Sequence, residues 1–511
     1  LSTIGIATGT LSSRILGLIR DMTVAALFGR GVTDAWLVAF RIPNLARRIF
    51  GEGSLTASFL PVFVSLKVED GKKGNERRDL ANAVHLLLVI ALGMMTALGI
   101  VFAESVVSLL APGFEADVDK FGLTIRLAKI MMVFILLVCL YAYYMAILNS
   151  HKKFLLPAFA PALLNVGIIS FCFMPQNWFA FSGEALGWGV VFGGSMQLAL
   201  VMFGLIRIHE FPSFSKNIFS ASVKKVFARL IPSVLGMGVL QLGVLINTRF
   251  ASQLEEGSNS WIFWADRLLE FPLSLVAVSM GTALLPSLSE YHSSGKKEKM
   301  LDLMNRSLRY IFYISVPAGV ALYILSTELV TLFYKRGQFS SVDVHNTAQV
   351  LSIYGAAIFS YASIRILQPG FYAVQNTWLP AVISFLSLVL HYFVAQELME
   401  RYGIYGLALS SVISATVNLV ALLTFYQILI GSIYWWELAK SITKILLASS
   451  AMAYFLVLTK EAMNVELALG KVYFLLVCVV GGAGVYFAST LILKSPEISL
   501  LKNRFARNRN Q

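Results

Sequence analysis

Apolar stretches long enough to cross a lipid bilayer follow one another along almost the whole of this 511-residue chain. A bilayer core about 30 Å thick needs roughly 20 helical residues for each crossing. Fourteen such stretches can be marked, near residues 3–28, 34–66, 84–110, 121–148, 155–174, 184–206, 226–252, 260–288, 307–333, 344–373, 378–396, 403–430, 438–459 and 471–493. The segments between them are short and carry Gly, Pro, Asn or charge. We therefore predict an all-α polytopic membrane protein, and we expect no catalysis from an extramembrane domain.

Composition excludes the other broad classes. Hydrophobic residues make up 57% of the chain and charged residues only 14%, with a mean hydropathy of +0.73. Soluble chains have about 45–50% apolar and about 25% charged residues, and disordered chains have the opposite bias. A soluble enzyme, a disordered scaffold and a fibrous repeat are therefore all disfavoured.

Motifs for catalysis, cofactors and metals are absent from the sequence. Cys139, Cys172 and Cys478 lie in apolar runs without a CxxC spacing or a nearby His cluster, which disfavours a disulfide framework and a metal site. There is no Walker-type glycine loop, HExxH motif or nucleophile elbow. We predict a transporter without a cofactor, rather than an enzyme.

The distribution of Lys and Arg predicts the orientation in the membrane. The net charge is +13, from 41 basic and 28 acidic residues. Basic residues collect in alternate loops, at 67–78, 152–153, 207–225, 296–306 and 494–509. The opposite loops are acidic or neutral, as at 115–119 and 255–256, with isolated cations such as Lys120. Because basic loops remain in the cytoplasm, we predict that both termini are cytoplasmic and that anionic lipid, rather than nucleic acid, meets the basic loops.

A faint internal duplication suggests two related halves. Short matches recur at a steady offset of about 223 to 226 residues: Ala39-Phe40-Arg41 with Ala265-Asp266-Arg267, Leu60-Pro61 with Leu285-Pro286, Gly113 and Asp119 with Gly337 and Asp343, and Leu156-Pro157-Ala158 with Leu379-Pro380-Ala381. Since six is even, two six-helix lobes would be related by an axis along the membrane normal. We predict lobes at 1–215 and 216–433, followed by two further helices and a basic cytoplasmic tail at 434–511.

Charges inside the first stretch are the first site candidates. Arg14 and Asp21 nearly share a helix face, Arg20 neighbours Asp21, and Gly17 between them permits a bend. The stretch lacks a basic leader, which predicts a retained span rather than a cleaved signal peptide. As the alternative, Arg20 and Asp21 mark the end of the span, with side chains reaching the headgroups.

The second stretch carries cations near its middle. Arg47 and Arg48 are followed at once by Gly51-Glu52-Gly53, which can break the helix. Glu52 stands four residues after Arg48, so a structural Arg48–Glu52 pair is the alternative to a functional role.

The corresponding stretch in the second half carries Asp266, Arg267 and Glu270, so Arg267 has local acids available for pairing. It also aligns with Arg41 through the repeat. An excess of guanidinium groups between two lobes predicts an anionic cargo, since the planar Arg fork binds phosphate bidentately. Other intramembrane polar groups are read as near-interface or packing residues: Arg126, Lys129, Arg249, Arg365 and His391.

Several blocks of residues resemble those of one known family. They are Ser13-Arg14 with Gly17 and Arg20-Asp21, Thr33-Asp34-Ala35, Pro43-Asn44-Leu45 with Arg47-Arg48 and Phe50 to Gly53, Ala265-Asp266-Arg267 with Glu270-Phe271-Pro272, and Leu367 with Pro369-Gly370-Phe371-Tyr372. Together they closely resemble the MurJ (MviN) family of bacterial lipid II flippases, over nearly the whole chain.

The resemblance implies a fold, a cargo and a site. The implied fold is that of the multidrug/oligosaccharidyl-lipid/polysaccharide (MOP) exporter superfamily, with fourteen helices. The implied cargo is lipid II, undecaprenyl-pyrophosphate bearing the peptidoglycan disaccharide-pentapeptide, moved from the inner to the outer leaflet of the bacterial cytoplasmic membrane. Carried onto this sequence, the required cavity arginines are Arg14, Arg20, Arg47 and Arg267, and further polar positions are Asp34, Glu52 and Ser260.

Some features of the family's pattern are missing or open. The sodium site of some members uses acidic and Asn positions, whereas this chain offers Gln241 and Asn247 in the seventh stretch and no carboxylate in the eleventh. The nearest alternatives are an exporter of another polyprenyl-pyrophosphate oligosaccharide, for O-antigen or capsule, and a cation/drug antiporter of the same fold. Cell-wall synthesis proteins are possible partners.

The last two stretches lack repeat partners and carry few charges. We predict that they line an apolar groove for the prenyl tail, with Gly481 and Gly484 facing it. The alternative is that these glycines serve tight helix packing.

Overall fold

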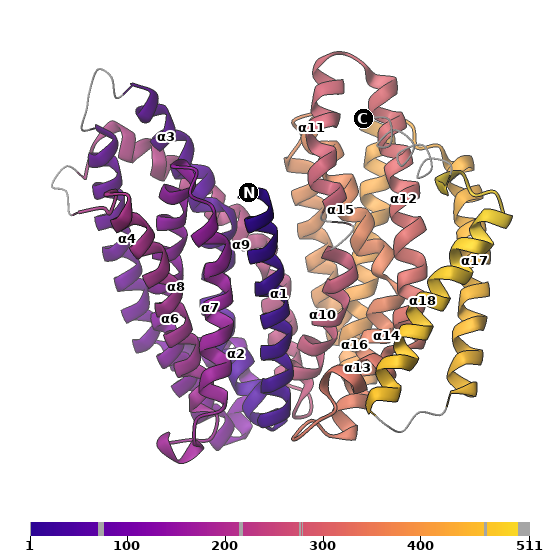
Figure 1. Ribbon diagram of the computed structural model, residues 1–511, viewed down its shortest axis with the longest axis horizontal. Helices are drawn as coiled ribbons and strands as arrows, with labels where there is room; N and C mark the ends of the chain where they lie inside the picture. The colour runs from indigo at the N-terminus through magenta and orange to yellow at the C-terminus, as the bar shows by residue number, and fades with distance from the viewer. Residues whose placement is uncertain are drawn as a thin grey trace. The chain divides into compact units, whose positions relative to one another are not determined.

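The computed structural model describes residues 2–69, 76–213, 218–274, 277, 279–463 and 468–498. Parts of the predicted basic loops, at 70–75 and 214–217, and the basic tail from residue 499 lie outside these ranges. Helices form two packed units (Figure 1), one made of residues 1–260 with 336–339 and the other of residues 261–335 with 340–511. The predicted domain boundaries follow the sequence duplication rather than packing, so they stay a prediction.

The first unit holds the helices of the first half and the beginning of the second. They are α1 (Ser2–Leu27), α2 (Arg30–Ala46), the π-helix η1 (Arg47–Ser54), α3 (Leu55–Glu69), α4 (Glu76–Val101), α5 (Ala103–Leu110), the 3-10 helix η2 (Pro112–Ala116), α6 (Val118–Ser150), α7 (Leu155–Cys172), the 3-10 helix η3 (Gln176–Trp178), α8 (Glu184–Arg207) and α9 (Ala221–Ser252). Figure 1 shows α6, α7 and α8 side by side. A Cβ on Gly167 of α7 would lie 2.4 Å from the Gly193 Cα of α8, so small residues let these two backbones approach closely.

The second unit contains the remaining helices. They are α10 (Ser258–Leu273), whose first three residues belong to the first unit, α11 (Ser279–Ser293), α12 (Lys297–Ile324), α13 (Ser326–Tyr334), α14 (Ser341–Ala356), α15 (Ile358–Ala373), α16 (Trp378–Leu429), α17 (Trp435–Ala462) and α18 (Ala468–Ile492). At the outer end predicted from the sequence, Lys460 of α17 forms an ion pair with Glu328 of α13. At the other end, Arg309 of α12 pairs with Glu437 of α17. These two ion pairs thus hold the C-terminal helices against the other helices of the second unit.

The 52 residues of α16 form two antiparallel helices. Gly403 has φ 56° and ψ −133°, a conformation open almost only to glycine. On either side of it, Ser410 contacts His391 and Ser414 donates to the Ser387 carbonyl. The residue numbers of each pair add up to the same value, as they must when a chain folds back on itself.

Many of the predicted membrane crossings are present as long apolar helices. Among the described residues, nine helices are individually long and apolar enough to cross a membrane, and the pair α14–α15, bent by 47°, makes ten. The division of α16 at Gly403 adds one more, and α1, α9 and α10–α11 lie where three further crossings are predicted. The predicted all-α fold is confirmed.

The two halves repeat the same helix breaks. Asp117 is the N-cap of α6 and Ser340 is the N-cap of α14, an offset of 223 residues. The break between α4 and α5 at Phe102 corresponds, at the same offset, to the break between α12 and α13 at Leu325. The faint sequence matches therefore coincide with matching local structure in the two halves.

Candidate functional site

Two of the predicted arginines lie on α1, in different surroundings. Arg20 is buried, and its Nε and Nη2 donate to Asp21 Oδ1 at 2.9 and 2.6 Å. Its Nη1 donates to Asn165 Oδ1 of α7 at 3.0 Å, and Asn165 Nδ2 donates to the Ser13 carbonyl. Arg14, nearly two turns earlier, is exposed. Arg20 and Asp21 therefore lie within the α1–α7 packing and do not reach out from the end of a span.

Arg47 and Arg48 open the π-helix in the middle of the second crossing. A π-helical turn holds more residues than an α-helical turn, and such turns are frequent at functional sites. Gly51 and Gly53, which follow the two arginines, have low helix propensity. Arg47 Nε donates to Asn44 Oδ1 at 2.9 Å, and Arg48 Nη1 donates to Gln241 Oε1 of α9 at 3.3 Å. The Glu52 side chain lies outside the described part of the chain, so the expected Arg48–Glu52 pair stays a prediction.

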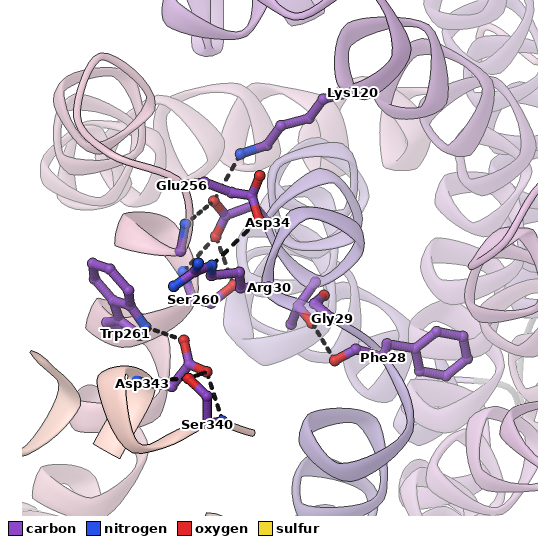
Figure 2. A network of polar contacts seen from close by, with 12 residues as sticks. Phe28, Gly29, Arg30, Asp34, Lys120, Glu256, Ser260, Trp261, Ser340 and Asp343 are labelled. Atoms are coloured by element: carbon purple, nitrogen blue, oxygen red, sulfur yellow. Dashed lines mark hydrogen bonds and ion pairs between the residues drawn. The ribbon is translucent and has the colours of Figure 1, made fainter. Parts of the chain in front are cut away.

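Asp34 is the centre of a buried polar network (Figure 2). Its carboxylate, 1% exposed, accepts hydrogen bonds from the Gly257 and Ser260 N–H groups, both at 2.8 Å, and from the Ser260 hydroxyl at 2.6 Å. Lys120 Nζ completes the set at 2.9 Å, and its ammonium lies 4.0 Å from the centre of the Phe114 ring. The structure thus brings together Asp34 and Ser260, two polar positions that the family resemblance implies.

The network supplies the start of α10 with a cap from another helix. The first N–H groups of a helix lack intrahelical partners and carry partial positive charge, and a carboxylate of α2 meets them here. A buried carboxylate is tolerable only when it is paired and hydrogen-bonded, and Asp34 fulfils both conditions. The arrangement fixes the beginning of α10, on which Asp266, Arg267 and Glu270 lie.

In the second unit, the predicted site residues pair locally. Arg267 Nη1 is 3.4 Å from Glu270 Oε2, and its guanidinium lies 5.2 Å from the centre of the Phe263 ring. Asp266 and Glu270 are exposed. One turn before Asp266, Trp261 Nε1 donates to Asp343 Oδ1 at 2.8 Å, and Asp343 forms a capping box with Ser340 (Figure 2).

Sequence reasoning missed three partners that complete these contacts. Lys120, expected to be an isolated cation, is the ion-pair partner of Asp34. Asn165 holds Arg20, and Gln241, considered only for a sodium site, is bound by Arg48. None of them carries a local signal, because each meets its partner from a helix distant in sequence.

The glycines of α18 have unequal surroundings. A Cβ on Gly481 would lie 2.7 Å from the Phe455 ring of α17, whereas a Cβ on Gly484 would meet nothing within 4 Å.

The part of the chain that the structure describes contains no group of three or more His, Cys, Asp or Glu able to hold a metal ion. The predicted arginines lie in both units, and Arg20, Arg47, Arg48 and Arg267 form hydrogen bonds with the side chains of other residues. Their role in binding stays a prediction.

These features define a class: a polytopic helical membrane protein, whose fold is that of the MOP superfamily. A solved structure titled "Lipid II flippase MurJ, inward closed conformation" has a TM-score of 0.82 at 24% identity and covers 97% of this chain and 100% of its own. An inward-facing multidrug resistance MATE family transporter has a TM-score of 0.66 at 15% identity, covering 82% of this chain and 94% of its own.

Sequence comparison narrows the class to a family. The family described as "Lipid II flippase MurJ" matches residues 24–478. A probable lipid II flippase MurJ of Bdellovibrio bacteriovorus is 42% identical, over 97% of this chain and 95% of the relative. A lipid II flippase MurJ of Burkholderia cenocepacia is 35% identical over 80% of each chain. The chain belongs to the MurJ family and is a multi-pass protein of the bacterial inner membrane.

Proposed function

We propose that this chain moves lipid II from the inner to the outer leaflet of the cytoplasmic membrane. The observation that carries the proposal is full-length similarity, at 42% identity, to a relative named as a probable lipid II flippase. A second line of support is the sign of the intramembrane charge. The Arg-rich segments suit a pyrophosphate, whereas a cation/drug antiporter would need acids in their place.

In this mechanism, Arg14, Arg47 and Arg267 contact the pyrophosphate. Guanidinium groups bind phosphate oxygens in pairs and remain charged at any physiological pH. The sugar-peptide head crosses through the wet interior, and the prenyl tail stays in lipid. The two lobes alternate between access to the cytoplasm and access to the outer side, with both termini cytoplasmic.

Arg20 belongs to the same proposed set with a more constrained role. Its guanidinium is oriented by Asp21 and Asn165, which leaves its charge on α1 in a fixed position. A carboxylate that already neutralises part of this charge weakens its pull on an anion. We therefore assign to Arg20 the placement of α1 and a weaker contact with the cargo than that of Arg14.

Membrane potential is the proposed drive. Moving one elementary charge across the membrane corresponds to about 2.3 kcal/mol per 100 mV. A sodium site has little support, since residues 378–396 contain no carboxylate and Gln241 already binds Arg48.

The decisive experiment is depletion of the protein in its own host, followed by labelling of lipid II in each leaflet. We expect lipid II to accumulate in the inner leaflet within a few generations while its synthesis continues. If lipid II reaches the outer leaflet at the normal rate after depletion, the proposal is refuted. Accumulation of a different polyprenyl-pyrophosphate oligosaccharide, with lipid II unaffected, would favour the alternative exporter.

A further inference from the structure

Two cations on α6 lie outside every contact described so far. Arg126 and Lys129 are both exposed. Among the described residues, neither forms a hydrogen bond or an ion pair, and the one contact of Arg126 is with the Phe181 ring, whose centre is 4.1 Å from the guanidinium carbon. At 1.5 Å per residue, they stand roughly 12 and 17 Å along the helix from Val118. That end of α6 is the outer end in the orientation that the basic loops predict.

The face of α6 that carries them lies between two neighbouring helices. On one side, Leu127 approaches Gly187 of α8, to within 3.1 Å of the Cβ position. On the other side, Met132 meets Gly99 and Thr96 of α4. At 100° per residue, Arg126 and Lys129 point between these two contacts, whereas Phe134 lies nearer the direction of Leu127 and packs on Gly194 of α8 and Phe40 of α2.

The two neighbouring helices carry exposed apolar side chains. On α8, Trp188 and Phe192 are 44% and 46% exposed, and on α4, Met94 and Leu98 are 59% and 57% exposed. Such surfaces of membrane helices contact lipid chains, and Trp favours the headgroup level. A pair of uncompensated cations on a lipid-contacting face is rare, because a charged side chain there is costly.

The fold itself does not require these charges. At the offset of 223 residues, the counterparts in the second half are Gln349 and Ser352 on α14, which are both neutral. The charges are therefore a particular property of the first unit and not of the repeated architecture.

From these observations we propose a binding site for an anionic phospholipid, made by Arg126 and Lys129 of α6 with the Phe181 ring against Arg126 and with Trp188 on the neighbouring helix α8. The guanidinium, held against Phe181, and the ammonium one turn below bind the negatively charged headgroup phosphate. The acyl chains follow the exposed apolar side chains of α4 and α8. A zwitterionic lipid supplies the same phosphate but cancels its charge, so the site discriminates by net headgroup charge.

A fluorescent label on the same face provides a local test. Gly122 lies one turn before Arg126, and a Cβ there meets nothing within 4 Å. The three native cysteines are buried, so Gly122→Cys in the full-length chain reacts selectively with a thiol-reactive fluorophore. The labelled protein is placed in nanodiscs of phosphatidylcholine with increasing brominated phosphatidylglycerol, or with brominated phosphatidylcholine of identical chains.

We expect half-maximal quenching at an about tenfold lower mole fraction of brominated phosphatidylglycerol than of brominated phosphatidylcholine. The Arg126→Gln/Lys129→Gln double variant should lose this preference. Arg207→Gln is the matched control, because Arg207 is also an exposed arginine over a ring, that of Phe203, at the opposite end of α8. It should keep the preference.

Equal quenching by the two lipids in the parent chain would overturn the proposal and assign the cations to ordinary interfacial placement. A preference that survives in the double variant would overturn it as well. If the double variant fails to fold, the single variants Arg126→Gln and Lys129→Gln replace it, each with an expected partial loss, against Arg126→Lys, which should retain the preference.

Discussion

At the scale of single residues, the arginines differ in burial and in the side chains that contact them. Arg20 is buried and bound by Asp21 and Asn165, whereas Arg14 is exposed on the same helix. Arg47 uses its Nε for Asn44, and Arg267 pairs with Glu270 at 3.4 Å in a partly exposed position. Such half-exposed pairs are weak, so an anionic cargo can compete for these guanidinium groups.

The first prediction is that Arg14→Ala, Arg47→Ala and Arg267→Ala each abolish complementation of a depleted strain while membrane abundance is unchanged. Lys at these positions should restore growth only partly, since a point charge lacks the bidentate fork. Arg401→Ala serves as the control, because Arg401 is exposed and pairs with Glu397 on its own helix. Full activity of all three Ala variants would contradict a cationic binding site.

The second prediction concerns Asp34. Asp34→Ala leaves the Lys120 ammonium buried without its carboxylate and removes the acceptor of the Gly257 N–H, just before α10, and of the Ser260 N–H in its first turn. Removing one partner of a buried pair costs about 3–5 kcal/mol. We expect a clear drop in the apparent unfolding temperature of the purified protein.

A double-mutant cycle isolates the charge contribution of Asp34. Lys120→Met added to Asp34→Ala should recover part of the loss, because the unpaired ammonium is then gone. If the two substitutions are simply additive, the ion pair contributes little and the hydrogen bonds to α10 dominate.

At the scale of elements, the hairpin of α16 depends on Gly403. Its positive φ, with ψ near −133°, lies in a region that L side chains rarely adopt. Gly403→Ala should destabilise the protein by about 1–3 kcal/mol, measured as a lower unfolding temperature or as loss of folded protein. Gly93→Ala, within α4 and with nothing within 4 Å of its Cβ position, should be neutral or slightly stabilising. Equal effects of the two would contradict the assigned strain.

The two C-terminal helices, α17 and α18, allow a comparison between two glycines of α18. Gly481 faces the Phe455 ring at 2.7 Å, and Gly484 faces open space. Gly481→Leu should therefore lower protein abundance through lost helix packing. Gly484→Leu should leave abundance unchanged and, if α17 and α18 guide the prenyl tail, reduce transport of full-length lipid II more than binding of a short-chain analogue. If Gly484→Leu reduces transport of full-length lipid II and binding of the short-chain analogue equally, α17 and α18 do not form a groove for the prenyl tail.

At the scale of the whole molecule, the basic loops predict the orientation. Ser294 and Glu255 are both exposed and lie in loops at opposite ends of the crossings. Glu255→Cys should react with a membrane-impermeant maleimide in right-side-out vesicles, and Ser294→Cys only after permeabilisation. The buried native cysteines give a low background. The reverse pattern would contradict cytoplasmic termini.

Much of the fold could be predicted from the sequence because each membrane crossing is encoded by a contiguous run of residues. Each run of about 20 apolar residues identifies one helix, and the predicted duplication rests on short matches at offsets of about 223 to 226 residues. The breaks within crossings were less predictable. The division at Phe102, the π-helix at Arg47 and the bend after Ala356 depend on how each helix packs along its length.

The sequence by itself determined that this chain is a helical membrane transporter and which side chains place charge inside it, because apolar runs and their interruptions are properties of the primary structure. Only the tertiary structure decided which of those charges are already satisfied. Asp34 meets Lys120 and the start of α10, and Arg20 meets Asn165, across separations of 86 to 226 residues. No local pattern encodes such contacts, since they exist only once the helices have packed.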